Sequence, residues 1–215
     1  MTAKFNFKAV PFILAGLALP VYLVYPGKAT GHQKAPFTGR NFAHRGLHSR
    51  DKSVPENSAA AFARAAEAGY GVELDVQLSK DGQVVVFHDD TLDRVCGVHA
   101  RVDELDYSEL SGLSLCGSRE HIPLFSDVLK IINGRGPIIC ELKSGKHNRE
   151  LCEKTYRLIS SYPGDICIES FDPTIVAWFR FHAPDIVRGQ LASNAREFSG
   201  RCMKTATITS ATEEM

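Results

Sequence analysis

The sequence predicts an α/β protein built on a parallel sheet. Of its 215 residues, 44% are hydrophobic and 23% are charged, which is the composition of an ordinary globular protein. After a polar stretch over residues 26–39, short apolar runs alternate with segments of helical periodicity, and this alternation is typical of βα units. We therefore expect one folded domain of fewer than 200 residues.

The balance of charge argues against nucleic acid as a partner. The 25 Lys and Arg residues are matched by 25 Asp and Glu residues, so the formal net charge is zero. Proteins that bind nucleic acid through its phosphates carry a basic surplus or a clustered basic face. We expect no nucleic-acid partner.

The chain opens with a membrane or export segment. Residues 9–25 contain no charge, and as a helix they would reach about 25 Å, a little less than the hydrocarbon core of about 30 Å. A cleaved signal needs small residues after the apolar run, and only Ala29 lies nearby, so an uncleaved anchor is favoured over a signal peptide. Pro20 indicates a kink, and a buried helix of a soluble domain is the third alternative. Basic residues lie on both sides of the segment, so its orientation stays open.

Six cysteines are present, without any CxxC pair or other metal-ligand spacing. Two of them fall inside apolar runs, where a thiol behaves as a small hydrophobic side chain. We expect reduced, structural thiols, and three disulfides in an exported protein are the alternative. The cysteines are Cys96, Cys116, Cys140, Cys152, Cys167 and Cys202.

The first elements follow from periodicity and end signals. Residues 41–45 form a candidate strand, and a helix follows with Asn57 as its N-cap, apolar residues at helical spacing, and Gly69 at its end. Residues 71–78 then indicate a strand. A turn signal at residues 80–82 leads directly into a Val-rich strand over 83–88, so the second and third strands follow each other without a helix.

Residues 91–124 are loop-rich and predict an insertion beside the sheet, with one short helix around residues 103–113. Regular alternation returns at Ser126, whose helix stops at Gly134. The elements that follow are a strand over 137–142, a helix over 148–161, a strand over 166–170, a helix opened by Pro173, and a strand over 186–191. Residues 192–215 are polar and show no further pair of strand and helix.

Carboxylates gather on two of the predicted strands. Glu73 and Asp75 lie two residues apart, so their side chains point to the same face with Cα atoms about 7 Å apart. Glu141 and Lys143 repeat this geometry on the fourth strand. Parallel α/β folds place their sites at the carboxyl ends of strands, where three carboxylates and a lysine suit a hard cation and an anionic substrate. A solvated strand face and an internal ion pair are the structural alternatives.

Two histidines end two other strands. His44 closes the first strand and His88 closes the third, which makes them a candidate acid and base pair, although a lone histidine is usually structural. Arg45 offers a bidentate contact to phosphate, and Gly46 would let the backbone approach a ligand. Hydrolysis of a phosphodiester needs these groups: a cation, cationic side chains, one base and one acid.

Ten short motifs carry these residues and resemble, in order and approximate spacing, those of the glycerophosphodiester phosphodiesterases. The resemblance covers about residues 40–191. It implies a TIM barrel of the (β/α)8 type that cleaves deacylated phospholipids to sn-glycerol 3-phosphate and an alcohol. The motifs are His44-Arg45-Gly46, Pro55-Glu56-Asn57-Ser58, Glu73-Leu74-Asp75-Val76, Asp81-Gly82, Val86-Phe87-His88-Asp89, Leu92-Asp93-Arg94, Ile122-Pro123-Leu124, Glu141-Leu142-Lys143, Ser170-Phe171 and Gly189-Gln190-Leu191.

The resemblance also implies roles for individual residues. A divalent cation, Ca²⁺ or Mg²⁺, would be bound by Glu73, Asp75 and Glu141. The general acid and base would be His44 and His88, and the phosphate would be held by Arg45 and Lys143. The Glu56-Asn57 pair is expected to order the loop beside His44. The order of chemical steps, through a cyclic phosphate or by direct attack of water, stays open.

The chain is short for this fold. A (β/α)8 barrel typically needs about 250 residues, whereas 176 remain from Arg40 onward, with six recognisable strands. We expect residues 1–37 to form the membrane segment and linker, residues 38–191 the phosphodiesterase domain, and residues 192–215 a polar tail in place of the last two βα units. A truncated reading frame is favoured over assembly with another chain. The open edges of strands one and six would permit self-association.

Two functions of different classes therefore stay open. The first is a membrane-associated, metal-dependent phosphodiesterase acting on glycerophosphodiesters, with secretion after signal cleavage as the alternative location. The second is a catalytically silent remnant that binds a phosphate ligand or a protein partner. A phospholipase acting on intact lipid is a lesser alternative.

Overall fold

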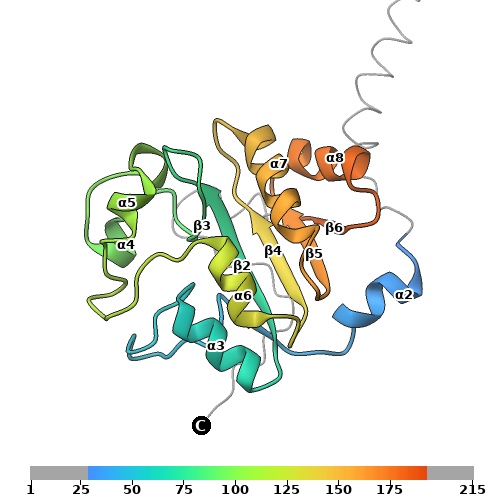
Figure 1. The fold of residues 1–215 in the computed structure, drawn as a ribbon, viewed down its shortest axis with the longest axis horizontal. Coiled ribbons are helices and arrows are strands. Elements are labelled where there is room, and N and C mark those ends of the chain that lie inside the picture. The colour runs from blue at the N-terminus through green and yellow to red at the C-terminus, as the bar shows by residue number, and fades with distance from the viewer. Residues whose placement is uncertain (1–28, 193–215) are drawn as a thin grey trace, which may run out of the picture.

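Six strands form one sheet in the computed structural model, which describes residues 29–192 (Figure 1). The order along the sheet is β1-β2-β4-β5-β6, all parallel, and β3 pairs antiparallel with β2. This arrangement confirms the α/β class, with the sheet open between β1 and β6. The strands are β1 Phe42–His44, β2 Gly71–Leu78, β3 Val84–Val86, β4 Ile138–Leu142, β5 Ile166–Ser170 and β6 Val187–Gln190.

Strands β1 and β3 share one edge of β2. β1 pairs with the beginning of β2, where His44 lies opposite Glu73, and β3 pairs with its end, where Val86 lies opposite Val76. β4 occupies the other edge of β2 as far as Val76, so β3 must continue the edge that β1 begins. Because β3 runs antiparallel, its last residues return toward the end of β1. The expectation that His44 and His88 end equivalent strands is therefore wrong, since these strands run toward each other.

Four helices pack on one face of the sheet (Figure 1). Alternate strand residues such as Val72, Leu74 and Val76 point to this face and are almost completely buried against the helices. Removal of this apolar surface from water, at about 25 cal/mol per Å², is the main stabilising contribution of the core. The helices are α3 Ala59–Glu67, α6 Phe125–Ile132, α7 Asn148–Ile159 and α8 Pro173–His182.

The ends of two helices differ by one residue from the sequence prediction. The N-cap of α3 is Ser58, whose hydroxyl accepts a 3.1 Å hydrogen bond from the backbone N of Ala61. Asn57, the predicted cap, instead has a left-handed backbone with φ of 53°. The C-terminal end of α6 also differs from the prediction. Its C-cap is Asn133, which adopts a left-handed backbone one residue before Gly134, where the helix was expected to stop.

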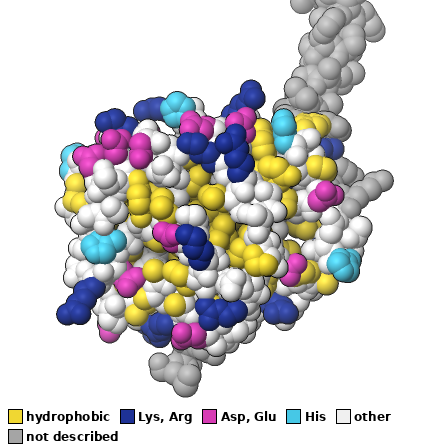
Figure 2. Space-filling model, in the orientation of Figure 1, with side chains coloured by type: hydrophobic (Ala, Val, Ile, Leu, Met, Phe, Trp, Pro, Cys, Tyr) yellow, Lys and Arg dark blue, Asp and Glu magenta, His cyan; other side chains and the backbone are white. Residues whose placement is uncertain are grey.

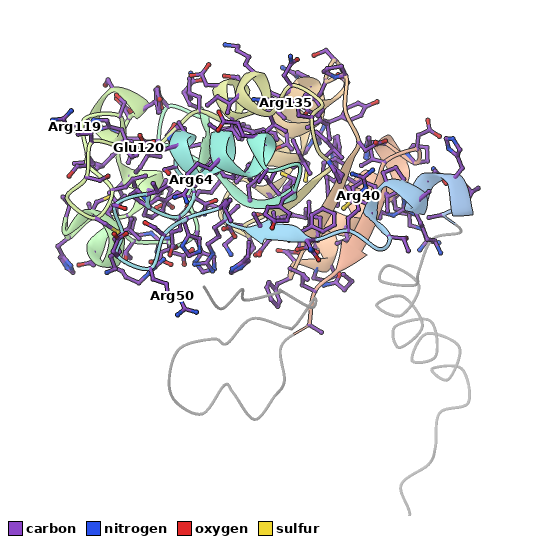
Figure 3. All side chains as sticks on the ribbon, turned by 90° about the horizontal axis from the view of Figure 1, so that it is seen from below. Arg40, Arg50, Arg64, Arg119, Glu120 and Arg135 are labelled. Atoms are coloured by element: carbon purple, nitrogen blue, oxygen red, sulfur yellow. The ribbon has the colours of Figure 1, made fainter. Side chains whose placement is uncertain are left out.

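The insertion forms a small lobe beside β3 (Figure 1). It holds α4 Asp93–Cys96, a 3₁₀ helix η3 Val102–Glu104 and α5 Tyr107–Leu110, so the single helix predicted over 103–113 is wrong. The chain is extended at Leu105, and Asp106 begins a new helix with a capping box to Glu109. Glu120 fastens the lobe to the sheet domain, because its carboxylate accepts a 3.0 Å hydrogen bond from Ala60 at the start of α3 (Figure 3).

Short helices precede β1 where a polar linker was expected. α2 Gly31–Lys34 begins at a capping box of Thr30 and Gln33, and the 3₁₀ helix η2 Ala35–Phe37 follows. The predicted membrane segment, residues 9–25, and residues 193–215 lie outside the described residues. Between residues 29 and 192, no helix has the length and hydrophobicity needed to cross a membrane. Figure 2 shows basic and acidic side chains interspersed on the visible face.

Five of the six cysteines lie in the described part, and all five are free thiols. Cys140 and Cys152 are buried in the core between the sheet and the helices. Cys202 lies outside the described residues.

Candidate active site

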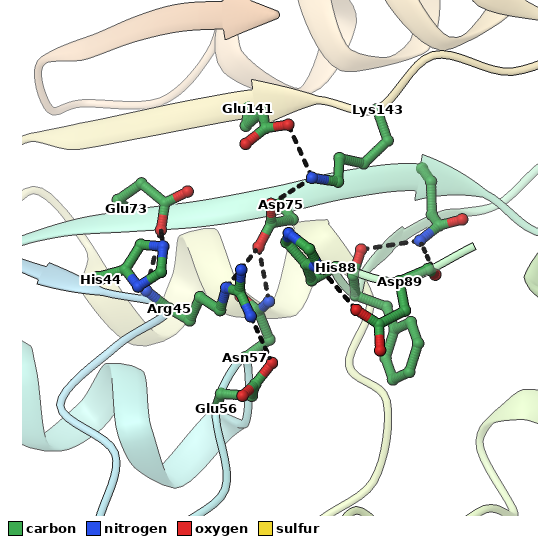
Figure 4. A network of polar contacts seen from close by, with 12 residues as sticks. His44, Arg45, Glu56, Asn57, Glu73, Asp75, His88, Asp89, Glu141 and Lys143 are labelled. Atoms are coloured by element: carbon green, nitrogen blue, oxygen red, sulfur yellow. Dashed lines mark hydrogen bonds and ion pairs between the residues drawn. The ribbon is translucent and has the colours of Figure 1, made fainter. Parts of the chain in front are cut away.

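Three carboxylates meet on the face of the sheet that the four helices leave uncovered. Asp75 lies opposite Glu141 in the register of β2 and β4, and Glu73 lies one pleat earlier on β2. One oxygen from each of the three side chains lies within 4.8 Å of the others, and all three residues are buried (Figure 4). Strand alternation therefore brings the three predicted cation ligands together at one point.

Two cationic side chains border this cluster. The Lys143 Nζ atom lies 2.7 Å from Glu141 Oε1 and 3.1 Å from Asp75 Oδ1, the latter without hydrogen-bond geometry. The Nε atom of Arg45 lies 3.6 Å from Asp75 Oδ2. Asp75 is thus the central carboxylate, with a cationic side chain on each side.

Burial and mutual repulsion determine how the three carboxylates titrate. Burial, followed by the charge of Asp75, raises the pKa of Glu73 well above its ordinary value. Burial also raises the pKa of Glu141, against the attraction of Lys143. At Asp75 burial opposes ionisation, but Lys143, His88 and Arg45 outweigh it and lower the pKa. The three carboxylates have only two cationic side chains beside them, a lysine and an arginine. This excess of acidic groups fits a hard divalent cation bound through oxygen.

Arg45 joins the carboxylates to the loop that follows β1. Its backbone is left-handed, with φ of 57°, and its backbone N donates a 2.9 Å hydrogen bond to Glu73 Oε2. Its Nη1 donates to Glu56 Oε1 at 2.8 Å. Its Nε is buried 3.6 Å from Asp75 Oδ2 and makes no hydrogen bond to any of the described residues.

Both predicted histidines reach the cluster (Figure 4). His44 Nε2 lies 3.8 Å from Glu73 Oε2, and burial, followed by the charge of Arg45, lowers the pKa of His44 to about 4. His88 pairs through Nδ1 with Asp89 Oδ1 at 2.7 Å. Gln77 on β2 holds the backbone on either side of His88, because its amide donates to the carbonyls of Phe87 and Asp89.

The loop between β1 and α3 contributes in two ways. Asn57 Nδ2 donates a 2.9 Å hydrogen bond to Asp75 Oδ2, and the left-handed backbone of Asn57 allows this reach. Gly46, expected to let the backbone approach a ligand, is also required for packing. A Cβ at Gly46 would lie 2.8 Å from the Cβ of Ala61 on α3, and its φ of +79° also disfavours other residues.

The structure adds a carboxylate that sequence reasoning missed. Glu169 on β5 lies opposite Glu141, so its side chain points to the same face. Burial, followed by the charges of Glu141 and Asp75, raises the pKa of Glu169 to about 7. Strand alternation over 166–170 carried the signal, but it needs the register between β4 and β5 to be recognised. Arg94 of the insertion, which contacts Glu56 and Asp89, was also missed as a site residue.

Known proteins share this fold and these sequence features. A glycerophosphodiester phosphodiesterase of Caldanaerobacter subterraneus is 41% identical over 111 residues, which cover 48% of this chain and 44% of that protein. An Oleispira antarctica phosphodiesterase, solved with the product sn-glycerol-3-phosphate, aligns with a TM-score of 0.65 and 26% identity over 72% of this chain and 66% of that one. A Thermotoga maritima glycerophosphodiester phosphodiesterase aligns with a TM-score of 0.59 and 29% identity over 74% and 64%.

The chain spans about half the length of several curated relatives that it matches. Residues 44–214 match the glycerophosphoryl diester phosphodiesterase family, so the match begins at the last residue of β1 and includes β2 to β6 and every predicted site residue. The motif resemblance, the parallel sheet and the carboxylate cluster agree with this match. The chain belongs to the glycerophosphoryl diester phosphodiesterase family.

Proposed function

We propose that this protein hydrolyses glycerophosphodiesters to sn-glycerol 3-phosphate and an alcohol in a reaction that depends on a divalent cation. The observation that carries the proposal is the meeting of three buried carboxylates, within 4.8 Å of one another, with two cationic side chains and two histidines. Family membership supports the same reaction class.

The cation would be held by Glu73, Asp75 and Glu141. Three carboxylates supply only oxygen ligands, which suits Ca²⁺ or Mg²⁺ better than a softer metal. A bound divalent cation would offset the negative charge of the phosphate group in the transition state. The choice between Ca²⁺ and Mg²⁺ is left to experiment.

Arg45 and Lys143 would hold the phosphate. Both lie beside Asp75, close to different oxygens of its carboxylate, and the guanidinium of Arg45 can offer hydrogen-bond donors to a phosphate oxygen. The sn-glycerol-3-phosphate bound to the Oleispira antarctica phosphodiesterase supports a glycerol phosphate moiety as the recognised part of the substrate.

The two histidines would divide the proton transfers. His44 is neutral at neutral pH, because burial and Arg45 lower its pKa to about 4, so its lone pair is available to accept a proton from the attacking oxygen. His88, whose Nδ1 pairs with Asp89 Oδ1 at 2.7 Å, would donate a proton from Nε2 to the departing alkoxide. Glu56 and Asn57 would keep Arg45 and Asp75 oriented.

The test is release of sn-glycerol 3-phosphate from glycerophosphocholine by the full chain, with Ca²⁺, with Mg²⁺ and with a chelator, beside a thermal melt. We expect turnover with at least one cation and none with chelator, from a protein that melts cooperatively. A cooperative melt with no turnover under any condition would contradict the proposal. Binding of glycerol 3-phosphate in that case would favour the silent phosphate-binding module.

Association with other molecules is a further part of the proposal. Strands β1 and β6 each pair on one side only among the described strands, so a second copy of the chain could add to either edge. Sedimentation of the full chain at several concentrations tests this self-association. Membrane attachment through residues 9–25 stays a prediction from the sequence, as does the division into residues 1–37, 38–191 and 192–215.

A further inference from the structure

Arg94 enters the site from the insertion and contacts two carboxylates at once. It lies on α4, outside the sheet, and its side chain is 50% exposed. Its Nε and Nη2 donate to the two oxygens of Asp89 at 2.6 and 3.1 Å. Its Nη1 and Nη2 donate to the two oxygens of Glu56 at 3.1 and 2.6 Å. One planar guanidinium therefore makes a bidentate contact with each of two carboxylates.

Each of these carboxylates also contacts a group of the proposed reaction. Asp89 pairs with His88 Nδ1 at 2.7 Å, and Glu56 accepts a hydrogen bond from Arg45 Nη1 at 2.8 Å. Arg94 thus connects the proposed acid to the proposed phosphate ligand, without contacting the three-carboxylate cluster in the described structure. The connection runs through hydrogen bonds of 2.6 to 3.1 Å only.

The geometry of this contact needs arginine. Isolated surface ion pairs contribute little to stability, but bidentate pairs within a network are the exception because each one fixes the orientation of a carboxylate. The ammonium of a lysine is a point charge and cannot direct parallel hydrogen bonds to both oxygens of two partners. The titration of the partners agrees with a tight contact. Burial opposes the ionisation of Glu56, but hydrogen bonds from Arg94 and the charge of Arg45 outweigh it and lower the pKa of Glu56 to about 2.

We propose that Arg94 is a positioning residue: it locks Asp89 as the acceptor of the His88 Nδ1–H, so that Nε2 faces the substrate and is the nitrogen from which the ring donates its second proton, and it locks Glu56 so that Arg45 faces the phosphate. The other ring nitrogen of His88 faces Asp75 in Figure 4, which is the orientation this role requires. Through Arg94 alone, the insertion over residues 91–124 then helps to orient the site. The effect on catalysis rests on the proposed function, whereas the effect on the His88 tautomer does not.

The first test measures the tautomer of His88 directly. The full chain is labelled with ¹⁵N-histidine, without added metal, and the His88 ring is assigned by its disappearance in a His88→Asn variant. We expect the neutral ring of the native protein to be protonated on Nδ1 alone. Arg94→Met frees Asp89 to rotate, so it should give a mixture of the two tautomers.

A matched variant separates this role from a general effect of losing a surface arginine. Arg101 lies in the same insertion, is 42% exposed and pairs with Asp103 at 2.8 Å, but makes no contact with Glu56 or with Asp89. Arg101→Met should leave the tautomer of His88 and the turnover unchanged. Arg94→Lys, which keeps the charge and the aliphatic stem, should show the mixed tautomer in a protein that melts near the native temperature.

The second test is a double-mutant cycle on turnover. Arg94→Met should lower kcat on the order of 10²-fold, the lower end of what a positioned acid or base contributes. Asp89→Asn should cost a similar factor, and the two together should cost less than the product of the two separate factors, because part of the effect of Arg94 acts through Asp89 and His88.

The outcomes distinguish the two proposals. A shifted tautomer in Arg94→Met, with no turnover from the native protein, would refute the proposed function and keep the role of Arg94 in orienting His88. A native tautomer in folded Arg94→Met or Arg94→Lys would overturn the positioning role, and so would strictly additive losses in the cycle.

Discussion

The two faces of the sheet are both buried, but for opposite reasons. On β2, Val72, Leu74 and Val76 point to the helices and are at most 1% exposed, whereas Glu73 and Asp75 point the other way and are 8% and 0% exposed. Burial of the apolar residues stabilises the fold, while burial of a carboxylate costs free energy unless a partner compensates it. One strand can carry both because side chains alternate from face to face. The comparison teaches that one strand can stabilise the fold with the residues on one face and supply the proposed chemistry with the residues on the other.

Glu73→Gln should give the largest effect on activity and the opposite sign on stability. The change removes one anionic ligand, so metal-supported turnover should be abolished. It also removes repulsion with Asp75 and Glu141, which helps to raise the pKa of Glu73, so with chelator present the free energy of unfolding should rise by about 1–2 kcal/mol. The measurements are turnover with each cation and urea unfolding in chelator.

The matched control is Glu67→Gln, because Glu67 is an exposed carboxylate on α3, which packs on the face of the sheet opposite the cluster. Glu67→Gln should change neither the metal-supported turnover nor the free energy of unfolding. Native metal dependence in Glu73→Gln would refute the assignment of Glu73 as a ligand.

His44→Ala and His88→Ala should each lower kcat by roughly 10²–10⁴-fold, because each removes a group that transfers a proton. Neither residue belongs to the core between the sheet and the helices, so the melting temperature should change little. His99→Ala serves as the control, since the His99 side chain is 99% exposed in the insertion. A purely structural histidine would instead lose stability and activity together.

Leu74→Ala should lower stability without changing catalysis, because Leu74 lies on the face of the sheet that the helices cover. The side chain is completely buried against the helices, so its truncation should lower the free energy of unfolding by about 2–5 kcal/mol, as measured by urea unfolding. Turnover per folded molecule should stay near the native value. The half-buried Leu158 on α7 gives a control, and Leu158→Ala should cost less. Loss of turnover in a fully folded Leu74→Ala would show that the two faces are not independent.

The pH dependence of stability tests the buried carboxylate of Glu169 on the face of the sheet that carries the cluster. Its pKa is raised in the folded protein to about 7, so between about pH 4.5 and 7 the folded state binds more protons than the unfolded state. Stability in chelator should therefore fall as the pH rises through this window. Glu169→Gln should remove about 1–2 kcal/mol of that fall, after allowance for solvent screening. The measurement compares urea unfolding at pH 5 and pH 7.5.

Glu73 and Glu141 contribute to the same fall, so only the difference between native protein and variant reports on Glu169. Glu153→Gln on the outer face of α7 should keep the native pH dependence, because Glu153 pairs with Arg149 on the surface. An identical pH dependence in Glu169→Gln would place its carboxylate in solvent.

Much of the fold was predictable because its signals are local. The strand over residues 71–78 and the strand over 166–170 were predicted with their observed bounds, since both are apolar runs bounded by turn residues. Short elements in the insertion were not, because Leu105 and Asp106 break one apparent helix into two. The start of α3 lies one residue after the predicted one, because the side chain of Asn57 donates a hydrogen bond to Asp75 instead of capping the helix.

By itself, the sequence determined the residue types of the site and the face of each strand, because a period of two residues fixes which side chains point the same way. It also determined the family, through ten ordered motifs. Only the tertiary structure decided which side chains meet. The antiparallel return of β3 brings His88 to the end of β1, the register of β5 adds Glu169, and the docking of the insertion brings Arg94 onto Glu56 and Asp89. The residues of the site that meet lie up to 66 positions apart, as Asp75 and Glu141 do, and their meeting depends on strand register and helix packing, which no local pattern encodes.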